Sequence, residues 1–227
     1  YLHEFMGPMM SDALARHGDG LPANVLPVQV NEVTQVGLEA IAASFAYGAS
    51  AVRFLIRAKP RHDMAGLAQT IALAQPILAG VGFAGSRVAT IETDDPDALG
   101  TTLRAIAPMD GAAKPATFSA VGGKRDVIRL ALREMHAVAP HPVDVVALPA
   151  GAPFGTLEVK VEGCTLCLSC VSACPTGALS ADTERPTLRF AEDACVQCGL
   201  CQATCPEKVI GLKPQLDFRS ATAMSRI

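Results

Sequence analysis

The first 163 residues of this chain contain no cysteine, and the whole sequence contains no tryptophan and only 4% aromatic residues. All eight cysteines lie between Cys164 and Cys205. A large excess of charge of one sign is also absent, because the chain has 19 Lys and Arg and 22 Asp and Glu. No strong electrostatic field therefore favours nucleic acid or an anionic membrane as a partner. The cysteine placement predicts a cysteine-rich module joined to a cysteine-free domain.

Long apolar runs are absent as well. The best candidate, residues 36–56, contains Glu39 and Arg53 and so falls short of the roughly 20 uncharged residues that span a bilayer. No basic stretch leads into an apolar run near the start, so we predict neither a membrane span nor a secretion signal. Because the chain begins at Tyr1 and stops abruptly at Ile227, we expect it to be a fragment or a processed product.

Residues 23–150 alternate short β-branched runs with longer Ala-rich and Leu-rich stretches at helical spacing, which predicts strands connected by helices. The expected strands cover residues 24–30, 51–56, 87–91 and 143–148, and the expected helices residues 31–47, 63–78, 95–106 and 124–138. This pattern predicts an α/β domain with a mostly parallel sheet and helices on both faces. We therefore divide the chain into a segment 1–22, an α/β domain 23–150, a cysteine-rich domain 151–217 and a truncated tail 218–227.

Short motifs in the α/β domain do not predict a ligand. Residues 80–85 have the G-x-G-x-x-G spacing of dinucleotide sites, but they follow a predicted helix and precede a strand, so we predict a turn. Residues 122–125, Gly-Gly-Lys-Arg, are interpreted as a loop and helix start, with anion binding as the alternative. His62, His136 and His141 lack a second ligand at metal spacing, so we expect satisfied or exposed histidines.

The cysteines form the pattern C-x-x-C-x-x-C-x-x-x-C-P twice. The members are Cys164, Cys167, Cys170 and Cys174 in the first run, and Cys195, Cys198, Cys201 and Cys205 in the second. Each cysteine of the second run lies 31 positions after its counterpart (195 − 164, 205 − 174), which indicates an internal duplication. Two-residue gaps let a chain wrap closely around one cube-shaped cluster of iron and sulfur, and they direct three thiolates at three of its irons.

Two other uses of the cysteines agree less well with the sequence. Disulfides need an oxidising compartment, which no secretion signal supports. Zinc modules generally pair one C-x-x-C with a distant partner pair and do not use a third cysteine at the same short spacing. Apolar residues alternate before each run, at 157, 159 and 161 and at 188 and 190, which predicts a strand leading into each cysteine loop.

The two runs, CTLCLSCVSACP and CVQCGLCQATCP, resemble the bacterial 2x(4Fe-4S) ferredoxin family over about residues 157–212. The resemblance implies a small α+β ferredoxin-like domain, two 4Fe-4S clusters and one-electron transfer. In that family the cysteine before proline ligates the other cluster. This assigns Cys164, Cys167, Cys170 and Cys205 to cluster 1, and Cys195, Cys198, Cys201 and Cys174 to cluster 2. Such clusters imply a reducing compartment, most simply bacterial cytoplasm.

The first domain carries a second resemblance. Residues 24–30 (NVLPVQV), 36–38 (VGL) and 46–49 (AYGA) are similar to the iron-sulfur delta subunit family of methyl-viologen-reducing hydrogenase and heterodisulfide reductase. Where that family has cysteines after its first two strands, this chain has residues 31–35 and 61–63 without any cysteine, which implies a docking scaffold. The whole arrangement resembles the multi-cluster ferredoxin proteins of bacteria.

These observations predict an electron-transfer protein or subunit with no catalytic residues of its own. Its expected partner is a flavin- or metal-containing dehydrogenase, hydrogenase or reductase, docked by the α/β domain. Nearly neutral charge in the ferredoxin module favours a fixed partner over a free shuttle, which usually uses a charged face for steering. The alternative is an oxidoreductase subunit whose α/β domain binds a flavin or nucleotide at the carboxyl ends of its strands. A third interpretation makes the clusters structural or redox-sensing.

Overall fold

A computed structural model describes residues 1–227 except 61, 183, 220–223 and 227. The chain forms two compact units, Tyr1–Pro142 and Val143–Ile227, and each is described by itself. In the part of the chain that the structure describes, no helix is both long and apolar enough to cross a membrane.

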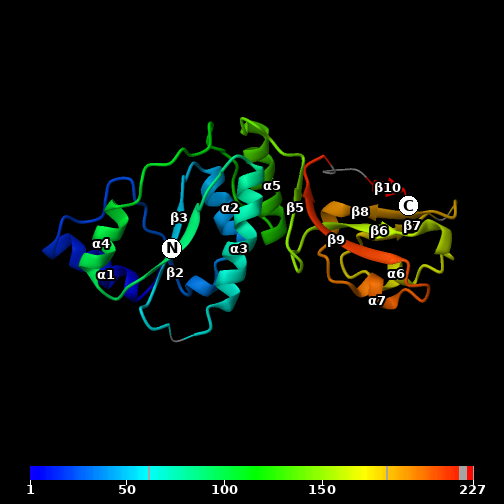
Figure 1. Ribbon diagram of the computed structural model, residues 1–227, viewed down its shortest axis with the longest axis horizontal. Helices are drawn as coiled ribbons and strands as arrows, with labels where there is room; N and C mark the ends of the chain where they lie inside the picture. The colour runs from blue at the N-terminus through cyan, green and yellow to red at the C-terminus, as the bar shows by residue number, and fades with distance from the viewer. Residues whose placement is uncertain (61, 183, 220–223, 227) are drawn as a thin grey trace. The chain divides into compact units, whose positions relative to one another are not determined.

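The first unit is built around a parallel sheet of four strands in the order β2-β1-β3-β4 (Figure 1). Its strands are β1 (Leu2–His3), β2 (Gln29–Val30), β3 (Val52–Ile56) and β4 (Val88–Glu92), and its helices are α1 (Met6–His17), η1 (Val33–Gln35), α2 (Leu38–Ala46), α3 (Ala65–Gly80), α4 (Pro96–Arg104) and α5 (Lys124–Val138). This confirms the prediction of a mostly parallel α/β domain.

Helices lie on both faces of this sheet, with α1 and α4 on one side and α2, α3 and α5 on the other (Figure 1). The alternation along β3 explains why both faces need cover, since successive side chains point to opposite sides. Leu55 packs with Leu14 of α1 and Leu99 of α4, whereas its neighbour Phe54 is fully buried.

Local sequence signals place several helix ends. The Asp95 side chain accepts a hydrogen bond from the Asp97 backbone N–H and so caps α4. Gly48, with φ of 106°, closes α2 through a hydrogen bond from its N–H to the Phe45 carbonyl, and Ala49 donates to Ser44. Gly80 is the last residue of α3, and residues 81–85 form the turn between α3 and β4, as predicted.

The first strand was not predicted. Residues 1–22 were expected to be a separate segment, but they supply β1, which pairs with both β2 and β3, and α1, which covers the sheet. A two-residue strand is too short to show alternation, so sequence pattern gave no sign of it. The strand expected over residues 24–30 is reduced to its last two residues.

The second unit contains two three-stranded antiparallel sheets, β5-β9-β6 and β10-β8-β7. Its elements are β5 (Val145–Ala147), β6 (Gly155–Val159), η2 (Val161–Gly163), α6 (Ser169–Ala173), β7 (Leu179–Ala181), β8 (Leu188–Ala191), η3 (Glu192–Ala194), α7 (Leu200–Thr204), β9 (Ile210–Asp217) and β10 (Met224–Arg226). Strand, 3-10 turn, cysteine loop, short helix and strand therefore occur twice in the same order.

The strand expected at residues 143–148 belongs to this unit. It forms as β5, but β5 pairs antiparallel with β9 rather than joining the parallel sheet of the first unit. The break between the units consequently follows Pro142, earlier than the predicted boundary at residue 150. A period of two indicates a strand, but it does not indicate which strand it pairs with.

The core of the first unit gives a stability prediction. We expect Phe54→Ala to lower the free energy of unfolding by about 3–5 kcal/mol, because Phe54 is fully buried and the cavity would be lined by packed neighbours. Leu26→Ala is the matched control, since Leu26 is 84% exposed and should change stability by no more than about 0.5 kcal/mol. Urea denaturation followed by circular dichroism measures both, and equal effects would contradict the prediction.

Candidate functional site

Two hollows in the second unit are each lined by four cysteines. The first is lined by Cys164, Cys167, Cys170 and Cys205, and the second by Cys174, Cys195, Cys198 and Cys201. Each hollow thus collects three cysteines of one run and the pre-proline cysteine of the other. These are the two groups into which the family resemblance divides the cysteines.

Left-handed backbone conformations shape the cysteine loops. Leu166 and Leu168, with φ of 54° and 61°, flank Cys167, and their counterparts Gln197 and Gly199, with φ of 53° and 79°, flank Cys198. An L residue in this region costs about 1–2 kcal/mol, and such strain concentrates at functional sites. Successive turns of this kind direct backbone N–H groups into a concavity and favour an anion, which is the charge of a cluster with four thiolates.

The pre-proline cysteine of each run lies in the hollow of the other run, because the short helix of its own run ends at it. Cys174 follows the last residue of α6 and Cys205 follows the last residue of α7. The next residue is proline in both cases, and proline at this place stops the helix. Since α6 and α7 pack against each other, each departing cysteine meets the hollow of the other repeat.

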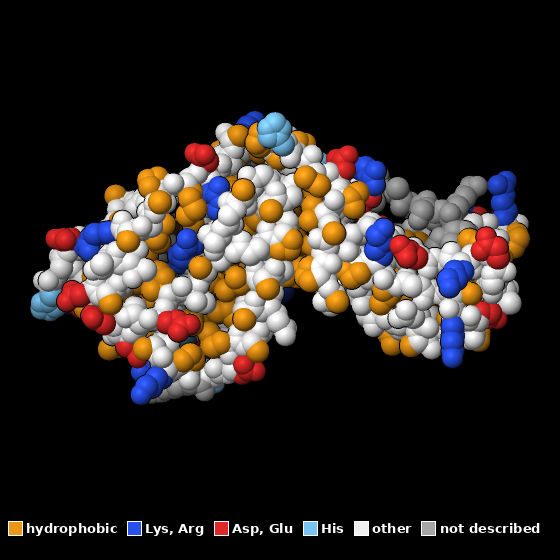
Figure 2. Space-filling model, in the orientation of Figure 1, with side chains coloured by type: hydrophobic (Ala, Val, Ile, Leu, Met, Phe, Trp, Pro, Cys, Tyr) orange, Lys and Arg blue, Asp and Glu red, His pale blue; other side chains and the backbone are white. Residues whose placement is uncertain are grey.

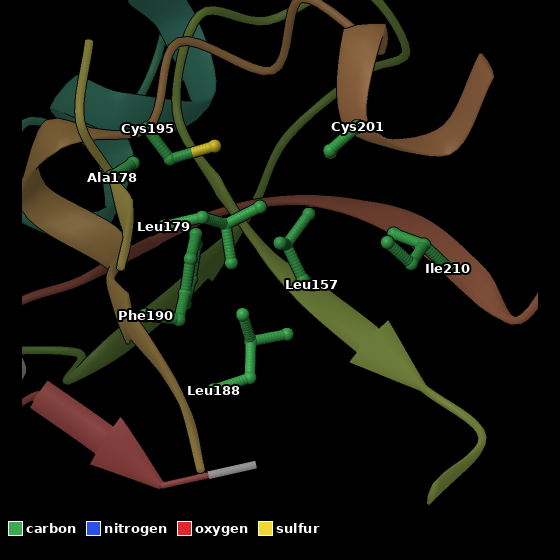
Figure 3. Packing of buried hydrophobic residues seen from close by; sticks show 8 residues of the cluster. All are labelled: Leu157, Ala178, Leu179, Leu188, Phe190, Cys195, Cys201 and Ile210. Carbon is green, nitrogen blue, oxygen red and sulfur yellow. The ribbon is translucent and has the colours of Figure 1, made fainter. Parts of the chain in front are cut away.

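The apolar core of the unit reaches both hollows (Figure 3). Its buried members are Leu157, Ala178, Leu179, Leu188, Phe190, Cys195, Cys201 and Ile210. Figure 3 shows the Cys195 sulfur near the side chains from β6 and β7. Thiols in such a place are either inert or ligands, and the presence of four cysteines around each hollow favours ligands.

Two exposed or half-exposed thiols ionise more easily than usual. The Ser169 hydroxyl lies 3.5 Å from Cys167 Sγ, and this hydrogen bond lowers the pKa of Cys167. Burial alone would raise the pKa of Cys174, but hydrogen bonds from the Leu179 backbone and from Thr176 outweigh it and hold the pKa below its usual value.

The opposite holds deeper in the hollows. Burial raises the pKa of Cys170, on α6, and of its counterpart Cys201, on α7. A thiolate at either position therefore needs a cationic partner such as iron to stay ionised. Sulfur-only ligand sets, loops that favour anions and buried thiols whose pKa values are raised by burial fit an iron–sulfur cluster.

The competing uses of the cysteines fit less well. All eight are free thiols, so the structure contains no disulfide among them. Among the described residues, no three His, Cys, Asp or Glu side chains converge as they do around a single ion. The thiols instead surround a hollow, which suits a cluster whose irons hold the thiolates apart better than it suits one zinc ion.

Sequence reasoning missed several side chains beside the thiols. Gln197 donates to Cys195, and Thr176 and Ser169 lie within hydrogen-bonding range of Cys174 and Cys167. A signal existed, because aligning the two repeats at their 31-residue offset marks the positions next to each cysteine. Only folding, however, determines which of these side chains turn toward sulfur.

A small polar cluster lies at the carboxyl ends of the parallel strands. His3 Nε2 is 3.4 Å and His62 Nε2 is 3.9 Å from Glu32 Oε1. The His62 side chain is 70% exposed, which confirms the expectation of an exposed histidine. Sequence spacing does not indicate that His3 lies near His62, because only the pairing of β1 inside the sheet brings the two near Glu32.

The first unit also contains a cleft of about 530 Å³ on the sheet face that carries α1 and α4. Its lining includes residues 24–28 and 47–53 together with Leu55, Leu99 and Leu103. These two segments lead into β2 and β3, so the cleft lies toward the amino ends of these strands. A nucleotide bound as in doubly wound folds would lie at the carboxyl ends instead.

The repeated fold and its two four-cysteine hollows define a ferredoxin-like iron–sulfur module. Comparison with family models agrees, since residues 154–209 match the 4Fe-4S dicluster domain. The match contains all eight cysteines, and it supports 4Fe-4S binding and a role in iron–sulfur electron transfer. No curated protein matches the chain.

Proposed function

We propose that this chain is an electron-transfer protein or subunit that carries single electrons through two 4Fe-4S clusters, one in each hollow. The observation that carries the proposal is the sorting of the cysteines. Each hollow receives four, three from one run and the pre-proline cysteine of the other, inside the span that matches the dicluster domain. A 4Fe-4S cluster, when bound, supplies a one-electron redox couple.

In this proposal the cysteine sets act as ligands, and the surrounding residues control water and charge. Cys164, Cys167, Cys170 and Cys205 hold cluster 1, and Cys195, Cys198, Cys201 and Cys174 hold cluster 2. Leu188 and Ile210, both buried, exclude water from the inner side of the first hollow, and buried Leu157 and Phe190 do the same in the second. Cys167 and Cys198 are exposed, which gives each cluster one edge that a partner protein can approach.

The first unit serves, in this proposal, to dock the module onto a flavin- or metal-containing oxidoreductase. Support comes from its composition, since it contains no cysteine, and from exposed apolar side chains on it such as Leu26, Tyr47 and Val121. Leu26 and Tyr47 both line the cleft of the first unit, and exposed apolar residues that gather at one place mark interaction sites in general. The rival, a flavin or nucleotide bound by this unit, predicts a flavin absorbance in the purified protein, and docking alone predicts none.

The test is metal analysis of the anaerobically purified chain followed by EPR after dithionite reduction. We expect about eight iron and about eight acid-labile sulfide per chain, and a spectrum of two magnetically interacting reduced clusters. Iron near four with a simple one-cluster spectrum would reduce the proposal to a single centre. Zinc without sulfide would overturn it. Clusters that resist reversible reduction would favour a structural role.

A further inference from the structure

The two hollows are related by the internal repeat, but several equivalent positions differ, and two of them change the lining beside the cysteines. Leu166 in the first repeat corresponds to Gln197 in the second, and Thr176 corresponds to Glu207, each pair 31 positions apart. Leu166 and Glu207 line the first hollow, whereas Gln197 and Thr176 line the second. The first hollow therefore has an aliphatic side chain and a carboxylate where the second has an amide and a hydroxyl.

The Gln197 amide is held against a cysteine sulfur. Its backbone N–H and its side-chain Nε2 donate to Cys195 Sγ at 3.4 and 3.5 Å, and Nε2 also donates to the Thr156 carbonyl at 3.0 Å. Gly155 leaves the space for this side chain, because a Cβ there would lie 2.7 Å from Gln197 Cδ. Two N–H donors from one residue thus point at the same thiolate of the second hollow.

The carboxylate of the first hollow is also fixed. Glu207 Oε1 accepts a hydrogen bond of 2.8 Å from Thr165 Oγ1, next to Cys164. Among the described residues, Glu207 is the one charged side chain that lines either hollow. At the equivalent place in the second hollow, Thr176 Oγ1 lies 3.7 Å from Cys174 Sγ and is able to donate to it.

Both differences act on the reduction potential in the same direction. Reduction adds negative charge, so N–H and O–H donors to the thiolates stabilise the reduced form, and a nearby carboxylate destabilises it. Two features act the other way. The Ser169 hydroxyl lies 3.5 Å from the exposed Cys167 Sγ in the first repeat, where the second repeat has Leu200. Cys195 and Cys201 of the second hollow are each only 8% exposed, and a buried site disfavours added charge. Part of that cover is the Gln197 amide itself, however, and a donor that covers sulfur stabilises charge where an aliphatic group would not.

Building on the proposed function, we propose that Gln197 and Glu207 make the two clusters unequal. The cluster held by Cys195, Cys198, Cys201 and Cys174 has the higher reduction potential and receives the first electron from a one-electron reductant. The cluster held by Cys164, Cys167, Cys170 and Cys205 has the lower potential and is reduced second. An electron entering the module consequently comes to rest in the second hollow, so direction is built into the two repeats.

The test is an equilibrium redox titration of the intact holoprotein, followed by EPR, with variants that install the residue of the other repeat. The wild type should titrate in two steps. Gln197→Leu should lower the midpoint potential of the higher-potential step and leave the other step unchanged. Glu207→Thr should raise the midpoint potential of the lower-potential step and leave the other step unchanged. We expect each shift to change the one-electron equilibrium at least tenfold, which corresponds to about 59 mV.

Two further variants keep the test decisive if a swap disturbs cluster loading. Glu207→Gln removes the charge, retains a partner for Thr165, and should also raise the lower step. Leu166→Gln offers the first hollow a new donor and should raise the lower step as well. Gln202→Leu and Glu184→Thr are controls, because both residues are exposed and line neither hollow, and they should move neither step.

The outcomes separate this inference from the proposed function. A single wild-type step, or a swap that moves the wrong step or moves its step in the wrong direction, would overturn the inequality while two reducible clusters remain. Absence of about eight iron and eight sulfide from the wild type would instead remove the proposed function itself. If burial dominates instead, the cluster of the second hollow has the lower potential. Gln197→Leu would then move the lower-potential step, and Glu207→Thr would move the higher-potential step.

Discussion

Replacing Cys205 with serine should remove the cluster of the first hollow and leave the cluster of the second hollow in place. Cys205 belongs to the second run in sequence, but it lines the hollow that contains Cys164, Cys167 and Cys170. Serine is a much poorer ligand for iron than thiolate, so we expect iron to fall from about eight to about four per chain. Metal analysis and EPR of the reduced protein measure the loss.

Cys174→Ser is the matched variant, since it should remove the cluster of the second hollow by the same reasoning. The surviving cluster is identified by whether its reduction potential shifts when Gln197 or Glu207 is replaced. In the Cys205→Ser protein the remaining potential should fall with Gln197→Leu and ignore Glu207→Thr. In the Cys174→Ser protein it should do the reverse. Survival of the opposite cluster in each case would contradict the cross-ligation.

The features predicted correctly from sequence are those with a strong local signal. Helix α5 begins at Lys124 and ends at Val138, as predicted, because two glycines precede an amphipathic stretch and Asp126 accepts a hydrogen bond from Gly123 N–H. The ferredoxin-type module was recognised from a cysteine spacing that occurs twice, and residues 154–209 match the 4Fe-4S dicluster domain. In both cases the information lies within a few residues of the feature.

Features that depend on distant neighbours were missed. β1 has two residues, and its place in the sheet depends on pairing with residues about 27 and 53 positions away, as in Leu2 with Gln29 and with Leu55. β5 was recognised as a strand, but its pairing with β9 was not. The contact between Gly155 and Gln197 joins residues on different elements, and nothing in the spacing of either glycine or glutamine indicates it.

Removing the clusters should unfold the second unit and spare the first. In the second unit the apolar core includes Cys195 and Cys201, and Cys170, Cys174 and Cys205 pack against it. Without iron, two hollows open inside this core, and Leu166, Leu168, Gln197 and Lys208 keep left-handed conformations that cost about 1–2 kcal/mol each. Small metal-stapled domains commonly lose their fold with the metal.

Hydrogen exchange with and without cluster removal by a chelator and oxidant measures this directly. We expect amides of Val143–Ile227 to exchange roughly a hundredfold faster, a loss of about 3 kcal/mol, because their protection rests on the stapled core. Amides of Tyr1–Pro142 should keep their protection, since that unit contains no cysteine and has a core of its own. Phe54→Ala provides the complementary control, because it should accelerate exchange in the first unit only. Retained protection around Phe190 in the cluster-free protein would mean that the apolar core alone holds the second unit together, and the cysteines would then be ligands without a structural role.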